Sequence, residues 1–323
     1  MSFGSLLKRA GGGHAEADPI ADAENVDVQH YLGYIWVAFV GVFAIYQLVF
    51  HLVRYIRTVV CLNNETQRYF STPHALFANF KKHFLDAPLF STRHHREFKL
   101  SSAINISTLP SRLQSVMLVG YFATNVYLSV WKVDFSKPYG DVAQEIRNRT
   151  GVMSVINMIP LFLLAGRNNP IIKLTHISFD TMNLIHRWFG RIVVLEAITH
   201  AAAWMANKVH SSKYPCITYN HGIFLTWLAA EGWAAVQASI TSKTSNFIPT
   251  GFMAVVAFTF ILVQSPGAIR HAYYETFLIG HIIGAAVAVA GVWIHLNGKH
   301  QQQMVYGVVA LWVFEVRTIC IVD

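Results

Sequence analysis

The chain is poor in charged residues. Only 13% of its 323 residues are Asp, Glu, Lys or Arg, whereas 54% are hydrophobic. A soluble domain of ordinary composition carries about a quarter charged residues. The scarcity of charge therefore argues against a water-soluble domain and favours a protein that lies in lipid.

Cysteine is also scarce, and a secretory leader is not apparent. The three cysteines, Cys61, Cys216 and Cys320, have no metal-like spacing and provide no disulfide framework. Residues 1–29 are polar and include Gly11-Gly12-Gly13, so they lack the apolar core of a signal peptide. We expect residues 1–29 to be a disordered tail and the first apolar run to serve as the insertion signal.

Long uncharged runs are what the chain has instead. Each approaches or exceeds the roughly 20 residues that span a bilayer as a helix. These runs are Tyr31–Val53, Leu113–Trp131, Thr150–Gly166, Thr244–Ile269 and Thr276–Gly298. A sixth span, Asn183–Ala206, contains three charged residues, and a seventh, His300–Phe314, is short. The sequence thus predicts an all-α polytopic membrane bundle with about seven transmembrane helices.

The cations set the expected orientation. The loop Arg54–Arg112, within the segment 30–143 that holds the first two membrane helices, carries nine Lys and Arg against three acidic residues. The positive-inside rule places this loop in the cytoplasm. It lacks motifs for base recognition, so we expect membrane lipid rather than nucleic acid as the partner of its charge.

Two pairs of histidines share one spacing. His186 and His200 lie fourteen residues apart, and so do His281 and His295. Fourteen residues are close to four helical turns, or about 21 Å of rise, so both imidazoles of a helix face nearly the same way. Two such helices side by side would offer two stacked bis-histidine sites. Imidazole is a good ligand for iron, and haem held from both faces favours electron transfer over oxygen activation.

Small residues accompany these histidines, and we expect them to let a planar porphyrin approach each helix. They are Gly190, Ala197, Gly284 and Gly291. Such residues also occur in membrane helices simply because they let backbones pack closely.

Three charged residues lie beside the ligands of the sixth span. Arg187 and Arg191 could contact haem propionates, since a buried cation needs an anionic partner. They could equally serve as anchors at the inner membrane surface and pair with Glu196. Glu196 could alternatively orient a ligand or relay charge.

The apolar segment His221–Ser242 decides how the histidines pair. If it lies on the outer face or re-enters, only Thr244–Ile269 spans between the histidine helices. Those helices are then parallel, so that His186 faces His281 and the other two histidines face each other. If the segment spans, the helices are antiparallel and the pairing is exchanged. The distribution of charge favours the parallel arrangement.

Several motifs around these residues resemble the ferric reductase transmembrane domain, which fungal metalloreductases share with NADPH oxidases. They are Arg149-Thr-Gly with Pro160-Leu-Phe-Leu-Leu-Ala-Gly-Arg167-Asn-Asn, His186-Arg-Trp-Phe-Gly-Arg through Glu196-Ala-Ile-Thr-His200, and Arg270-His-Ala-Tyr-Tyr-Glu275-Thr-Phe-Leu-Ile-Gly-His281. The loop Ala87-Pro-Leu-Phe to Asn105 is similar to filamentous-fungal members, and the resemblance covers about residues 30–320.

The resemblance implies that residues 144–323 form a di-haem transmembrane domain with two haem b groups. His186 and His281 would ligate the inner haem, and His200 and His295 the outer one. The implied activity is electron transfer to extracytoplasmic Fe(III) or Cu(II) chelates, in the plasma membrane or the vacuolar membrane.

The family continues into a flavin- and NADPH-binding portion, for which this sequence shows no glycine-rich phosphate loop after a strand. We therefore expect FAD and NADPH in a missing C-terminal portion or in a separate flavin reductase. Three alternatives stay open: a superoxide-generating oxidase of the same architecture, an ascorbate-fed di-haem cytochrome, and a non-catalytic scaffold derived from a reductase.

Overall fold

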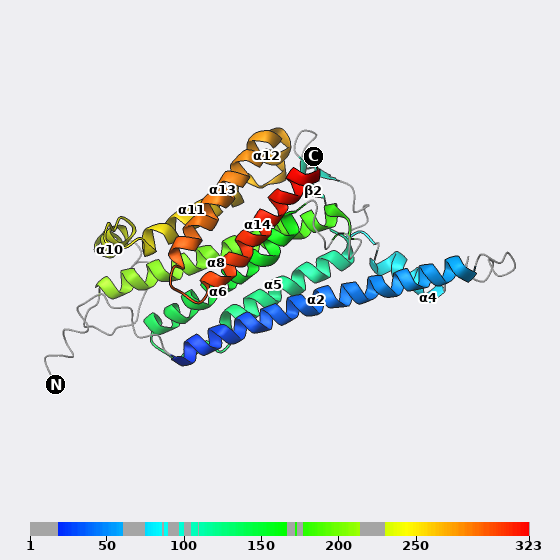
Figure 1. Ribbon diagram of the computed structural model, residues 1–323. Coiled ribbons are helices and arrows are strands. Elements are labelled where there is room, and N and C mark those ends of the chain that lie inside the picture. The colour runs from blue at the N-terminus through cyan, green and yellow to red at the C-terminus, as the bar shows by residue number, and fades with distance from the viewer. Residues whose placement is uncertain are drawn as a thin grey trace.

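The protein is a bundle of long helices that lie side by side (Figure 1). The computed structural model describes residues 19–60, 75–85, 87–89, 97–99, 105–108, 110–166, 172, 177–213 and 230–322. The predicted all-α membrane bundle is confirmed. One small addition precedes α5, where strands β1 (Glu97–Lys99) and β2 (Asn105–Thr108) pair in antiparallel fashion.

Six of the described helices are long and apolar enough to cross a membrane: α2, α5, α6, α8, α11 and α13. The helices are α2 (Pro19–Val60), α4 (Ala75–Phe80, continued by the π-helical turn Lys81–Leu85), α5 (Arg112–Val130), α6 (Tyr139–Ala165), α8 (Phe179–Lys213), α10 (Ala230–Ile240), α11 (Phe247–Gln264), α12 (Gly267–Ala272), α13 (Tyr274–His295) and α14 (Gln302–Val322). The seventh expected span falls in α14, which is not among the six but packs along α6.

The expected tail over residues 1–29 is wrong from Pro19 onward, because α2 already begins there. Asn25, Val28 and Leu32 recur at helical spacing and are buried. Val28 and Leu32 share an apolar cluster with Met153 of α6, among others. The stripe was missed because polar side chains interrupt it. Residues 1–18 lie outside the described part of the chain.

The segment His221–Ser242 is described from Ala230 onward, where it forms α10. This helix has 11 residues, which is about 16 Å of rise and too short for a hydrocarbon core of about 30 Å. It packs against α8 and α11. The described part of the segment therefore does not span as a helix, and among the described residues between the two histidine helices only α11 is long and apolar enough to cross.

The core lies between α6, α8, α11, α13 and α14. Met158 of α6, Val193 of α8, Ala288 of α13 and Val305 of α14 are all fully buried in one apolar cluster. Lipid is as apolar as these side chains, so close packing rather than water exclusion holds such helices together. In this core α6 packs along α8, and α11 packs along α13 and also contacts α8.

A buried polar network joins α5, α6 and α8. Asn157 of α6 is fully buried, and its side-chain amide donates to Asn125 at 2.6 Å and to Glu196 at 3.0 Å. The Tyr121 hydroxyl donates to the Asn157 oxygen at 2.8 Å. The carboxyl group of Glu196 thus bonds α6, whereas a pair with the nearby arginines was one of the roles considered for it. Its place in this network makes it a structural group.

Replacing Asn157 by leucine should lower the free energy of unfolding by about 2 kcal/mol, because two buried polar side chains and the partly buried Tyr121 hydroxyl would lose a partner. Thermal unfolding of the protein in detergent measures this. Asn207→Leu is the matched control, since Asn207 donates to the Gly140 carbonyl at a longer 3.3 Å. Equal destabilisation by the two variants would show that the network does not contribute specifically.

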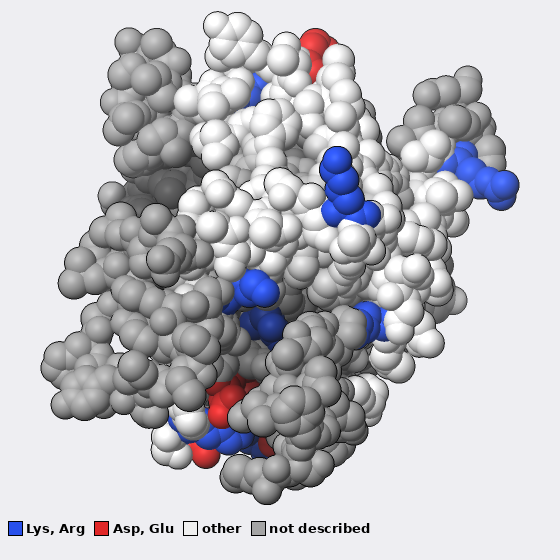
Figure 2. All heavy atoms as spheres, turned by 90° about the vertical axis from the view of Figure 1, so that its left-hand side faces the viewer, with Lys and Arg blue, Asp and Glu red and all other residues white. Residues whose placement is uncertain are grey.

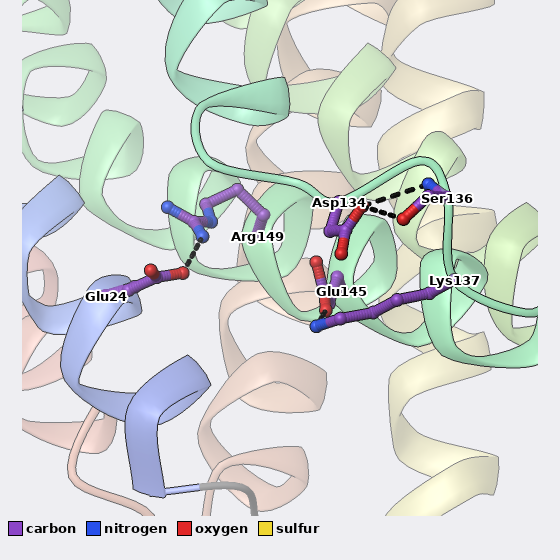
Figure 3. A network of polar contacts seen from close by, with 6 residues as sticks. All are labelled: Glu24, Asp134, Ser136, Lys137, Glu145 and Arg149. Atoms are coloured by element: carbon purple, nitrogen blue, oxygen red, sulfur yellow. Dashed lines mark hydrogen bonds and ion pairs between the residues drawn. The ribbon is translucent and has the colours of Figure 1, made fainter.

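The end of the bundle where α6 begins carries a group of charged side chains (Figure 3). Arg149 of α6 points to Glu24 of α2, with 3.5 Å between nitrogen and oxygen. Lys137 contacts Glu145 at 2.6 Å. Asp134 accepts hydrogen bonds from the hydroxyl and backbone two residues on, which lowers the pKa of its carboxyl group. Viewed from this end, the described surface is mostly uncharged, with acidic and basic side chains mixed toward the bottom (Figure 2).

Candidate functional site

The structure brings the four predicted histidines together as two pairs. His186 faces His281, and His200 faces His295, with 6.2 Å between ring centroids in each case. We call His186 and His281 the first pair, and His200 and His295 the second pair. The pairing is the one expected for parallel helices. The two pairs are about four turns, or about 21 Å, apart along α8 and α13.

The ring separation suits one metal atom between two imidazoles. An imidazole nitrogen binds a transition metal at about 2 Å, and its ring centre lies about 1 Å behind, so two opposed rings would have centres about 6 Å apart. No group of three or more His, Cys, Asp or Glu that could hold a metal exists among the described residues. Each pair therefore offers two ligands on opposite sides, and a bound metal would need its remaining ligands from elsewhere, as a porphyrin provides.

Three of the four imidazoles are held by a backbone carbonyl. The Nδ1 atoms of His200 and His295 lie 2.7 Å from the carbonyl oxygens of Arg147 and Phe247, respectively. That of His186 lies 3.0 Å from the Leu161 oxygen. A carbonyl can only accept, so Nδ1 carries the proton and Nε2 is left free as a ligand atom. Metal-binding histidines typically have this kind of support.

Two glycines make room for the rings of the second pair. A Cβ atom on Gly151 would lie 2.6 Å from Nδ1 of His200, and one on Gly251 would lie 2.6 Å from Nδ1 of His295. Each glycine lies one turn after the residue whose carbonyl accepts the hydrogen bond. Neither was expected from the sequence, because the match depends on the register between two helices.

The contacts of the small residues singled out in the sequence match the close helix packing that was one of their two expected roles. A Cβ on Gly284 would lie 2.9 Å from Ile261, and one on Gly291 would lie 2.9 Å from the Thr250 carbonyl oxygen. Both therefore let α13 pack closely on α11. Gly190 likewise lies near Leu161 of α6, and Ala197 belongs to the apolar core. The structure thus supports a packing role for Gly190, Gly284 and Gly291, whereas their making room for a porphyrin stays a prediction.

Three arginines gather near the first pair. Arg187 and Arg191 of α8 are close enough to Arg270 of α12 for their charges to interact. Arg191 also lies over the Trp188 ring, at 4.4 Å from its centroid. Burial lowers the pKa of Arg270, because the charged form loses water. Such a concentration of positive charge suits an anionic ligand group. Arg270 was missed because it lies outside the apolar spans.

Comparison with known proteins identifies this part of the chain. Residues 150–292 match the family described as ferric reductase like transmembrane component. This segment belongs to the ferric reductase transmembrane family. The ferric-reductase-like segment contains His186, His200 and His281, while His295 follows three residues after its end. The resemblance read from the motifs is confirmed over this segment.

Relatives that match most of this chain agree with the match of the ferric-reductase-like segment. The chain is 25% identical to ferric reductase transmembrane component 4 of Saccharomyces cerevisiae, over 89% of this chain and 36% of the relative. It is 23% identical to ferric/cupric reductase transmembrane component 2 of the same yeast, over 72% of this chain and 30% of the relative. A ferric/cupric reductase transmembrane component 1 of Candida albicans is also 23% identical, over 73% and 29%.

The chain spans about a third of the length of the curated relatives it matches. Their names and the six apolar helices together make it a multi-pass membrane protein.

Proposed function

We propose that the protein carries electrons across a membrane through two haem b groups, one at each histidine pair, to Fe(III) or Cu(II) chelates on the outer face. The observation that carries this proposal is the geometry of the pairs. Each has two imidazoles at 6.2 Å between centroids, and three of the four rings bond a backbone carbonyl through Nδ1. Iron and copper as acceptors are suggested by the names of the relatives.

The histidines would bind the haem iron atoms, and the arginines would balance charge. Nε2 of His186 and His281 would hold one iron atom, and Nε2 of His200 and His295 the other. Bound haem supplies a one-electron Fe(III)/Fe(II) couple at each level. The carbonyl-bonded Nδ1 protons fix the ligand tautomer and strengthen the imidazoles as donors. Arg187, Arg191 and Arg270 would offset the negative charge of propionates beside the first pair.

The orientation follows from the position of the cations. Under the positive-inside rule the basic loop before α5 is cytoplasmic, which puts the first pair on the inner side and the second pair on the outer side. Electrons would enter from a flavin, either in a further portion of the polypeptide or in a separate flavin reductase that uses NADPH. The plasma membrane is the proposed location.

The experiment is a haem determination on protein purified from membranes supplied with haem. We expect two haems per chain by pyridine haemochrome assay and a low-spin b-type spectrum after reduction with dithionite. With a flavin reductase and NADPH added, ferrozine should detect Fe(II) formed from a ferric chelate. A chain that binds no haem under these conditions overturns the proposal, and superoxide formed in place of Fe(II) would assign oxygen as the acceptor.

A further inference from the structure

His281 differs from the other three histidines in one contact. Its Nδ1 atom is buried and has no hydrogen-bond partner among the described residues. His186, His200 and His295 each bond a backbone carbonyl through the same atom. Buried polar atoms in folded proteins are nearly always hydrogen-bonded. A histidine whose Nε2 holds iron carries its proton on Nδ1, so His281 as a ligand would need an acceptor there.

A second buried polar atom lacks a partner beside the turn of α13 that carries His281. It is Nε2 of Gln264, the last residue of α11. The Gln264 side chain lies against Gly280, because a Cβ atom on this glycine would be 2.8 Å from Oε1 and 3.7 Å from Cδ of Gln264. Gly280 directly precedes His281. The two groups without partners thus occupy adjoining positions of the interface between α11 and α13.

The register of α11 on α13 agrees with this placement. A Cβ atom on Gly291 would lie 3.0 Å from Ala254, and one on Gly284 would lie 2.9 Å from Ile261. The contacts therefore advance along α11 as they go back along α13, as antiparallel helices require. Gln264 continues the series about one turn beyond Ile261, level with the histidine that α13 contributes to the first pair.

The carboxamide of Gln264 has the chemistry that an Nδ1 proton needs. Its Oε1 atom accepts hydrogen bonds through two lone pairs. This accepting end is the one that faces α13 in the structure. The terminal torsion of a glutamine is broad, so the carboxamide can turn without any change in the backbone.

We propose that Gln264 positions His281: in the haem-loaded protein, Oε1 of Gln264 accepts the Nδ1 proton of His281. This inference rests on the proposed haem function. The bond would keep Nε2 free for iron and increase the basicity of the imidazole. A more basic ligand favours Fe(III) over Fe(II), so the bond lowers the reduction potential of the first-pair haem. The other three supports are backbone carbonyls, whereas this one is a side chain that mutation can remove.

Gln264→Leu tests the proposal in the haem-loaded chain, because leucine fills similar space without an acceptor. We expect the ferric-to-ferrous ratio of the first-pair haem at a fixed ambient potential to fall by up to roughly tenfold, equivalent to a rise of about 59 mV for a one-electron couple. The second-pair haem should be unchanged. Potentiometric titration followed by visible spectroscopy measures both haems. His186→Ala, which should remove the first-pair haem, identifies the potential that belongs to the second pair.

Three further variants make the result specific. Gln264→Glu should lower the potential of the first-pair haem, because a carboxylate is a stronger acceptor. Gly280→Ala should displace the carboxamide and change the same potential in the wild type, but it should have no further effect when combined with Gln264→Leu. Gln237→Leu on α10 is the matched control, since this exposed glutamine undergoes the same exchange on another helix and should leave both potentials unaltered.

An unchanged or lowered first-pair potential in Gln264→Leu overturns the inference, because the proton of His281 would then have another acceptor, such as a water molecule. Loss of the first-pair haem from both Gln264 variants also overturns it, since glutamate keeps an acceptor. Full additivity of Gly280→Ala with Gln264→Leu would do the same. All three outcomes leave the proposed function intact, because the wild type would still hold two haems. A wild-type protein without bound haem would instead overturn the proposed function.

Discussion

Replacing His200 by alanine should remove one of the two haems and stop electron transfer, while the other haem stays in place. Among the described residues the second pair offers only two ligands, so the variant would leave His295 as the sole ligand in that part of the chain. Loss of a supporting group alone commonly costs 10- to 100-fold in metal affinity or activity, and loss of a ligand should cost at least about 100-fold. The first pair lies about 21 Å away and keeps its own contacts.

The measurement is the ratio of haem to protein, expected to fall from two to one, together with ferrozine-detected Fe(II) in the complete electron chain. His210→Ala is a matched control, because His210 stands on the same helix ten residues further on and packs against Tyr139, at 5.1 Å between ring centroids. It should retain both haems. A His200→Ala protein that still holds two low-spin haems would remove His200 from the ligand set.

The membrane helices and the pairing of the histidines could be read from the sequence. The uncharged runs correspond to α2, α5, α6, α11 and α13, and the sixth span to α8, because membrane helices need an almost continuous apolar surface. The equal spacing predicted that the two paired histidines of each helix lie on one face. The distribution of cations predicted that the two histidine helices are parallel. Each of these features depends on residues close together in one element or on total charge.

The features that the sequence did not reveal depend on contacts between elements. The start of α2 packs on α6 through a short apolar stripe that polar residues interrupt in the sequence. Glu196 bonds Asn157 of α6, although two arginines lie much closer to it in sequence. That α11 is the helix against which Gly284 and Gly291 pack likewise depends on the arrangement of the helices. In each case the deciding neighbour belongs to another helix.

The hydrogen bonds from the histidines to backbone carbonyls could not be predicted either, because they too join different helices. A backbone carbonyl has no residue identity, so nothing at Arg147 or Phe247 marks it as an acceptor. The only trace in the sequence is the glycine one turn later, Gly151 or Gly251, among the 20 glycines of the chain. Its meaning appears only once the register of α6 on α8 and of α11 on α13 is known.

Gly251→Val should therefore remove the haem of the second pair although it alters no ligand. A Cβ at this position would lie 2.6 Å from Nδ1 and 2.8 Å from Cε1 of His295, so the ring must leave the Phe247 carbonyl. Valine adds two more methyl groups and cannot be accommodated by a small tilt of the ring. Gly251→Ala should be milder, with a longer hydrogen bond like the 3.0 Å bond of His186 beside Ala165.

Haem content, the reduced spectrum and the two midpoint potentials measure this series, with the first-pair haem expected to be unchanged. Gly120→Val on α5 is the matched control, because a Cβ there would meet no heavy atom of the described structure within 4 Å. It carries the same cost of valine in a helix but should keep both haems. If Gly251→Val also kept both haems with unaltered potentials, the ring of His295 would not need its carbonyl, and the role assigned to this glycine would be wrong. A loss confined to the second pair would instead show that the supporting helix α11 determines whether His295 can act as a ligand.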